Sequence, residues 1–530
     1  MTDQPERAVF LLYLPFFVIV FAVALHARLP ADPAPYLWAD ESWRAYAILS
    51  TDSYPDFLQL MKDDPHLLLF SEWLFGKIGL AIFGFDESAF RIWPLIFSLL
   101  SIAGAGAFLI RCGTVSGALA AVFFIGVGWG FIFYVREFKP YALDFALTAW
   151  SFFAALYWAD KPSAGRLALL AGTLLAASLF SIVFVFIYPA ILAYLLHRQR
   201  GLYRQRGGRF ALALLLVPGC VFVAIYLLVY ASAASGRTQA FFSPYFLWPP
   251  ENIPFVLEAG GQSLIGFFGF AWAVVPVCYV YCGFISWRRK DGVWILLMTP
   301  LLFAAVASAL QLYPLFGRPS FFLFGIGAMS VGYCFGHVIE LVPVKFEGWW
   351  GRWGREAAGG ALSFGLILSY LVTGAAARGI EKGRQWPSPH AEKVFSTLAE
   401  HYRPGDAVKF NAGVKYTFLL YRDRLFQGGN LSELVDIPAR KVLERAIMEA
   451  DAPSLCRSLR VMIDDIRQAK RVWFLTTYTW QAYKHYQKVL PLLGDVEILL
   501  GEPRRGLFLL VPDPAAPALD CSRFEAKEGK

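Results

Sequence analysis

The stretch "RLALLAGTLLAASLFSIVFVFIYPAILAYLLH", residues 166–197, is apolar between two basic ends. Its flanks, "DKPSAGR" before it and "HRQRGLYRQRGGR" after it, are also basic. Positive charge collects on the cytoplasmic side of membrane proteins, so both flanks are expected inside the cell. About thirty apolar residues that leave and return to one side predict two short helices joined near "FSIVF". This segment sets the parity of the remaining helices.

The rest of the chain repeats this apolar character. Its 530 residues are 57% hydrophobic and only 17% charged, which excludes an ordinary soluble globular protein. Other runs long enough for a span of about twenty residues lie near 8–25, 89–110, 114–135, 141–159, 210–231, 263–286, 293–312, 319–342 and 358–378. With the two helices above, the sequence predicts about eleven transmembrane helices, and the basic loops "SWRRKDG" and "VKFEGWWGRWGR" then fall inside.

The composition changes after about residue 380 to mixed polar and apolar residues. A helical stretch "AEKVFSTLAEHY", a turn "RPGD" and the strand-like runs "RVWFLT", "VEILL" and "GLFLLV" predict a small soluble α/β domain. Cys456 and Cys521 both lie there, and a disulfide and two free thiols are both open alternatives.

The predicted fold is therefore an α-helical polytopic membrane protein with a C-terminal α/β domain. Residues 1–380 form the membrane domain, with a long first outer loop at 26–88, and residues 381–530 form the outer domain. Parity places the N-terminus in the cytoplasm and the C-terminal domain in the periplasm, so the inner membrane is the expected location. The run 8–25 has no convincing cleavage site after it and is expected to stay as the first helix.

The net charge of +8 does not indicate a nucleic-acid partner, because the basic residues form short clusters between apolar runs. The seven cysteines show no CxxC pair and no metal-ligand spacing, so they predict no metal site.

The first outer loop carries two adjacent acids, Asp40 and Glu41, in "LWADESWRAY". Either they contribute a carboxylate to a reaction at the outer face, or they only stabilise the start of a loop helix. The later part of the loop, "HLLLFSEWLFGKIGLAIFGF", has helical apolar periodicity with Glu72 and Lys77 as polar breaks. It predicts a helix along the outer membrane interface.

The outer link "REFKPYALD" packs Arg136, Glu137, Lys139, Tyr141 and Asp144 into nine residues. The Arg and Tyr residues could serve only as interface anchors. The two acids gain nothing from anchoring, and Asp144 lies about one turn into an apolar run, where an ionised group needs a partner or a role.

Two further polar residues lie on the predicted outer side. Arg318 precedes the tenth span, where it either binds an anion or snorkels to the interface. His66, in the "DPHL" turn, is either a site residue or a surface histidine.

The segments "ADESWRAYAIL", "DPHLLLFSEWLFGKIGLAIFGFDESAFRIWPLIFSLLSI" and "YVREFKPYALDFAL" resemble, in order and spacing, bacterial membrane glycosyltransferases of the C-type superfamily. That superfamily includes protein O-mannosyltransferases and the aminoarabinose transferases of lipid A. The chain departs in having "DPHL" for "HPPL", Lys139 for a second Arg, and "RIWP" for "RLPS". The resemblance covers roughly the first 150 residues, and "GRPSFFLFG" resembles a later element with an Arg before a span.

The resemblance implies transfer of a sugar from a polyprenyl-phosphate donor to an extracytoplasmic lipid, polysaccharide or protein. Asp40 is then the base that takes the acceptor proton, and Glu41 its neighbour or an acceptor-positioning group. The implied donor-phosphate ligands are Arg136, Lys139 and Arg318. The implied acceptor or sugar ligands are His66, Glu137, Tyr141 and Asp144.

A monophosphate donor carries less charge to neutralise than a nucleotide diphosphate, so we expect no obligatory cofactor, although adjacent Asp and Glu side chains could bind a divalent cation. Membrane lipids are the surrounding partners. The main rival is a transporter or flippase for lipid-linked sugars, but no internal repeat is apparent and the polar residues gather at one face. A second rival, an assembly protein with a partner-binding outer domain, leaves the long first loop unexplained.

Overall fold

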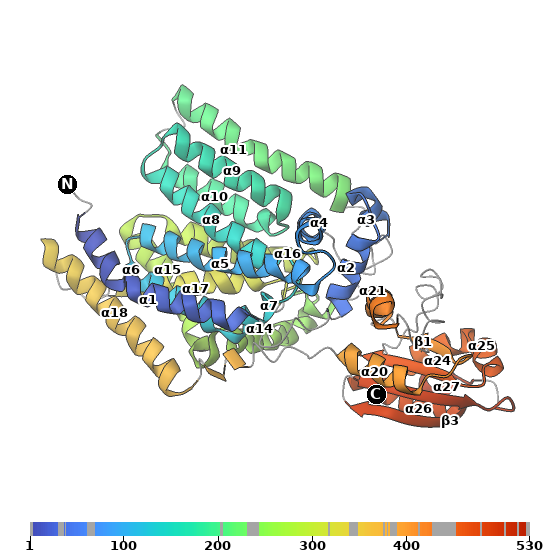
Figure 1. Cartoon of the computed structure of the whole chain (residues 1–530). Helices are drawn as coiled ribbons and strands as arrows, with labels where there is room; N and C mark the ends of the chain where they lie inside the picture. Colours follow the sequence, from blue (N-terminus) through green and yellow to red (C-terminus); the bar gives the residue numbers. More distant parts are fainter. Residues whose placement is uncertain are drawn as a thin grey trace. The chain divides into compact units, whose positions relative to one another are not determined.

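The apolar runs form helices in the computed structural model (Figure 1). The structure describes residues 4–29, 37, 39–60, 69–201, 205–230, 243–315, 318–338, 348–374, 377–378, 380–381, 390–411, 414–426, 452–477, 480–502, 505–516 and 519–525. Contacts divide the chain into two compact units, which we call the helical unit (Met1–Ala31 with Leu58–Trp386) and the tail unit (Asp32–Phe57 with Pro387–Lys530). The loop 26–88, predicted to lie outside, is thus divided between the two units.

The helical unit contains α1 (Gln4–Arg28), α4 (Phe70–Phe83), α5 (Glu87–Arg111), α6 (Val115–Val127), α7 (Trp129–Tyr134), α8 (Tyr141–Asp160), α9 (Ala164–Phe180), α10 (Phe184–Arg198), α11 (Arg206–Ile225), α14 (Ile253–Phe268), α15 (Val274–Arg289), α16 (Val293–Ala309), α17 (Phe321–Gly336) and α18 (Gly348–Val372). Short turns of π- or 3-10 helix extend it at η2 (Tyr226–Tyr230), η3 (Ser243–Tyr245), η4 (Pro250–Asn252) and η5 (Gly269–Ala273). The helix α3 (Tyr54–Leu60) runs across the sequence boundary between the units.

The segment 166–197 folds as two helices, as its length predicted. Helix α9 ends at Phe180 and α10 begins at Phe184, so the break falls on the expected "FSIVF". Among the described residues, three helices are long and apolar enough to cross a membrane: Glu87–Arg111, Tyr141–Asp160 and Gly207–Val229. A bent pair, Pro250–Phe268 with Ala271–Arg289, would make a fourth span.

Helices α6 and α17 form the centre of the helical unit. All residues of α6 are buried, as are nearly all of α17. The two helices approach so closely at Gly117 and Gly332 that a Cβ on Gly117 would lie 2.0 Å from the Gly332 carbonyl oxygen. Small residues allow such close helix packing inside membranes.

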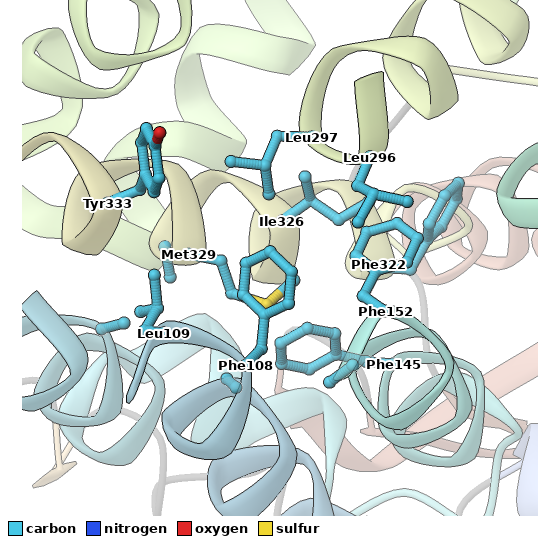
Figure 2. Close-up of a cluster of buried hydrophobic side chains, with 14 of the residues drawn as sticks. Phe108, Leu109, Phe145, Phe152, Leu296, Leu297, Phe322, Ile326, Met329 and Tyr333 are labelled. Carbon is cyan, nitrogen blue, oxygen red and sulfur yellow. The ribbon is translucent and has the colours of Figure 1, made fainter. Parts of the chain in front are cut away.

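A single apolar core joins α17 to its neighbours. Figure 2 shows Phe108 and Leu109 of α5, Phe145 and Phe152 of α8, and Leu296 and Leu297 of α16 around α17. In contrast, α11 leaves much of its apolar surface exposed, as a helix at the lipid-facing edge of a bundle would.

The tail unit is a small α/β fold. Its sheet has the order β1-β2-β4-β3, with β1 parallel to β2 and the other neighbours antiparallel. The strands are β1 (Ala407–Phe410), β2 (Val472–Thr477), β3 (Gly494–Glu502) and β4 (Arg505–Pro512). The helices are α2 (Ala39–Leu49), α20 (His390–His401), α21 (Lys415–Phe426), α24 (Ala452–Val461), α25 (Ile463–Gln468), α26 (Trp480–Val489) and α27 (Ser522–Glu525), with a 3-10 turn η7 (Leu490–Leu492).

Both faces of this sheet are covered. Trp473 and Leu475 of β2 belong to one apolar cluster, with residues of α20 and α21, whereas Phe474 belongs to a second cluster with residues of α24 and α26. Successive side chains of a strand point to opposite faces, which explains the alternation. Cys456 and Cys521 form a disulfide at the second face, so the pairing alternative holds.

Candidate functional site

The acidic pair opens a helix of the tail unit. Asp40 and Glu41 lie in the first turn of α2, where the helix dipole favours negative charge. Asp40 is partly exposed, whereas Glu41 has no exposed surface. The Arg44 side chain donates to the Asp40 carbonyl oxygen over 2.9 Å and lies over the Trp43 ring. The helix start fits the structural alternative for the pair, and of the two residues Asp40 alone is partly exposed.

The link between α7 and α8 is tightly folded in the helical unit. Glu137 and Lys139 are 1% and 6% exposed, and the Lys139 N–H donates to the Glu137 carbonyl oxygen over 2.8 Å. Arg136 is partly exposed. The link is therefore folded on itself, with the Glu137 and Lys139 side chains buried.

Arg318 lies next to this link. Its side chain is hydrogen-bonded to the side chain of Tyr134, the last residue of α7, and Glu137 also interacts electrostatically with Tyr134. The turn around Arg318 is held by the Tyr313 hydroxyl, which donates to the Pro319 carbonyl oxygen over 2.6 Å. The structure therefore brings together the two segments that sequence analysis selected for the donor phosphate.

An aromatic cluster supports this meeting point. The Tyr134 ring stacks on Phe267 of α14 at 5.7 Å between centroids. The Phe321 ring of α17 lies 5.7 Å from Phe267 and 6.4 Å from Tyr141. The cluster thus joins α7, α8, α14 and α17 beside the cations, and Tyr141 acts here as a packing residue.

A second polar group lies on the other side of the link. Glu72 and Lys139 line a cavity of about 20 Å³, with Ser71 and several aromatic rings around it. That volume holds one water molecule, which needs roughly 10–15 Å³. Asp144 accepts a hydrogen bond from the Ser181 hydroxyl over 2.5 Å and lies near enough to Glu72 for the two carboxylates to repel.

From the sequence, Glu72 is expected only as a polar break in an interfacial helix. In the structure it is 4% exposed and accepts a hydrogen bond from the Leu69 N–H over 3.2 Å at the start of α4. An acid in the first turn, three residues into the helix, is a usual sign of such a capping role. The capping role of Glu72 could have been predicted from its position in the sequence. Its proximity to Lys139 could not, because Lys139 belongs to a distant segment.

The predicted site residues thus fall in two units. Asp40 and Glu41 belong to the tail unit, and Arg136, Glu137, Lys139, Tyr141, Asp144 and Arg318 belong to the helical unit. His66 lies outside the described residues. In the described part of the chain, no group of three or more His, Cys, Asp or Glu side chains could hold a metal ion.

No protein-family model and no curated protein sequence matches the chain. Solved structures do match its fold. ArnT from Cupriavidus metallidurans bound to undecaprenyl phosphate is 14% identical, with 96% of this chain and 99% of that chain covered and a TM-score of 0.47. The archaeal oligosaccharyltransferase AglB from Archaeoglobus fulgidus, in complex with an inhibitory peptide and a dolichol-phosphate, is 12% identical, with 95% and 75% covered and a TM-score of 0.51.

A second structure of the Archaeoglobus fulgidus oligosaccharyltransferase, in complex with Zn and sulfate, is 13% identical, with 93% of this chain and 72% of that chain covered and a TM-score of 0.51. This chain therefore has the fold of an archaeal oligosaccharyltransferase.

Proposed function

We propose that the protein is a membrane glycosyltransferase that moves a sugar from a polyprenyl-phosphate donor to an acceptor at the outer face of the membrane. The observation that carries this proposal is the meeting of Arg318 with the 136–140 link through Tyr134. It sets the Arg318 side chain beside an aromatic cluster, next to the link that carries Arg136, and a cation in such a place suits a lipid-linked phosphate. AglB, whose fold the chain shares, was solved with a dolichol-phosphate.

In the proposed reaction, the acceptor oxygen attacks the anomeric carbon of the sugar. The bond from that carbon to the phosphate oxygen breaks, its electron pair stays on the phosphate, and polyprenyl phosphate leaves. The acceptor proton passes to the Asp40 carboxylate, and the cations stabilise the phosphate as its charge increases. Because Glu41 is fully buried, we assign it to holding the start of α2.

The three cationic residues proposed for the donor phosphate differ in how exposed they are. Arg136 and Arg318 are partly exposed and suited to contact a phosphate directly. Lys139 is buried beside Glu72, and we propose that it acts by holding the link. The acceptor or sugar roles of His66, Glu137, Tyr141 and Asp144 stay predictions.

The proposed topology has eleven spans, with residues 1–380 as the membrane domain and 381–530 outside, in the periplasm. Besides the three long helices and the bent pair, shorter apolar helices occur at Tyr13–Arg28, Val115–Val127, Ala164–Phe180, Phe184–Arg198, Val293–Ala309, Phe321–Gly336 and Glu356–Val372 in the described chain. Each matches one predicted span. The Cys456–Cys521 disulfide supports an oxidising compartment for the tail.

The decisive assay uses purified protein in vesicles with a polyprenyl-phosphate donor that carries a radiolabelled hexose or pentose. The proposal expects release of polyprenyl phosphate and appearance of label on a lipid, glycan or peptide acceptor. A flippase would instead move intact donor across the vesicle without releasing polyprenyl phosphate, and that result would contradict the proposal. A chelator should leave transfer unchanged, because a monophosphate carries little charge for a metal to neutralise.

A further inference from the structure

Leu37, just before the acidic pair, is hydrogen-bonded to α21, a helix that packs on the tail sheet. The Leu37 N–H donates to the Tyr421 hydroxyl of α21 over 2.8 Å, although the two residues are 384 positions apart. Leu37 is 1% exposed and Tyr421 is fully buried. A buried N–H that loses its acceptor is costly, so this bond fixes the chain just before Asp40.

A second contact holds the other end of the same helix. The Tyr46 ring of α2 lies 6.0 Å from the Tyr416 ring of α21 and packs against the apolar cluster of α20, α21 and the sheet. Two contacts one helix apart fix both the position and the rotation of α2. Figure 1 shows α21 beside α2.

Helix α21 is itself joined firmly to the sheet. Asn411, directly after β1, accepts a hydrogen bond from the Val414 N–H over 2.7 Å and donates to the Thr476 hydroxyl of β2 over 3.2 Å. Its own N–H donates to the Leu475 carbonyl oxygen over 3.1 Å. The sheet, α21 and α2 thus form one continuous set of packed and hydrogen-bonded elements.

We propose that Tyr421 and Tyr416 are positioning residues for the reaction, through which the tail unit sets the place of Asp40. This inference rests on the proposed function, because it gives Asp40 its role as the base. A base must stand within hydrogen-bonding reach of the acceptor proton, and a small displacement of it slows the chemical step. The tail is then a part of the active enzyme and not an independent accessory domain.

The first test is Tyr421→Phe, which keeps the ring and removes only the hydroxyl. We expect kcat to fall by about tenfold or more, with an unchanged KM for the donor. Tyr486→Phe is the matched control, because Tyr486 is also fully buried in the tail unit but packs in the other apolar cluster. Full kcat in Tyr421→Phe, an equal loss in the control, or a parallel rise of the donor KM would overturn the proposal.

The second test reads proximity without using activity. Tyr46→Cys and Tyr416→Cys, combined in membranes and treated with a short bismaleimide, should give a cross-linked peptide pair by mass spectrometry that neither single variant gives. Absence of that pair would overturn the inference. If the wild type transfers no sugar while the cross-link forms, the proposed function fails and the α2–α21 contact stands, so the two failures are distinguishable.

Discussion

Two adjacent carboxylates differ sharply in their surroundings. An α-helix turns by about 100° per residue, so neighbouring side chains face different directions. In α2 this leaves Asp40 partly exposed and removes Glu41 from solvent altogether. The structure therefore gives the two acids different surroundings, which the sequence "DE" alone does not indicate.

Replacing Asp40 by Asn keeps the shape of the side chain and removes its basicity. We expect sugar transfer to fall by at least about 100-fold, the lower range for loss of a general base. Activity of the wild type should fall as the pH decreases, since the carboxylate gains a proton, and this limb should be absent in the variant. Initial rates with a labelled donor across pH measure both effects.

Glu41→Gln is the companion variant, with a milder loss of rate. A helical circular dichroism spectrum unchanged in both variants controls for folding. Near-normal transfer by Asp40→Asn would reduce the acidic pair to a helix-starting role and make Glu137 or Asp144 the next candidate for the base.

Other residue-level expectations depended on partners that a sequence does not reveal. The cost of an ionised group in an apolar run predicted that Asp144 needs a partner, and Ser181 supplies it over 2.5 Å. The position of Asp144 in an apolar run was enough to predict that it has a partner, but not which residue the partner is. Ser181, which donates this hydrogen bond, lies in the break between α9 and α10. The packing of α8, α9 and α10 is what brings it to Asp144.

Among the helices, the break between α6 and α7 is stabilised by hydrogen bonds from an arginine of α1. Arg28, the last residue of α1, is 3% exposed and donates to the carbonyl oxygens of Ile125 and Gly126 over 2.7 and 2.8 Å, and to the Ser98 hydroxyl. Carbonyl groups at a helix end lack partners within the helix, and a guanidinium can satisfy several of them. Arg28 thus fixes the helix that leads to the 136–140 link.

Arg28→Met should lower the free energy of unfolding by about 3 kcal/mol, because it leaves buried carbonyl groups without donors. Arg28→Lys should cost less, since one ammonium keeps part of the bonding. Thermal unfolding in detergent measures both, with Arg209→Met, an exposed arginine of α11, as the control. Equal stability of Arg28→Met and the control would remove this role.

Lys139 and Glu72 both line the cavity between α4 and the link, and we expect their contributions to stability to be coupled. Lys139→Met should destabilise the protein by about 3 kcal/mol, because Glu72 then remains buried with less compensation. Adding Glu72→Gln should recover part of the loss, with a coupling energy of about 1–3 kcal/mol. A double-mutant cycle of unfolding free energies measures it, and strict additivity would show that the two residues act independently.

At the scale of the molecule, the apolar runs and the tail strands were readable because each depends on local pattern. Strand β1, with only four residues, and the place of α2 were not. The apolar pattern predicts loop 26–88 as part of the membrane domain, whereas contacts group Asp32–Phe57 with the tail. That grouping depends on contacts between residues more than 350 positions apart, such as Leu37 with Tyr421.

The orientation of the whole chain is tested by reporter fusions after residues 205 and 400. The positive-inside rule predicts a cytoplasmic reporter at the first site and a periplasmic one at the second. Reporters on the same side at both positions would reject the eleven-span topology.

We propose that a lipid-linked phosphate binds where Arg318 meets the 136–140 link. A cryo-EM structure of the protein in nanodiscs with a polyprenyl phosphate tests this binding site. We expect phosphate density in contact with the guanidinium groups of Arg318 and Arg136, beside the aromatic cluster of Tyr134. Phosphate density at another site, with Arg318 facing bulk lipid, would contradict it.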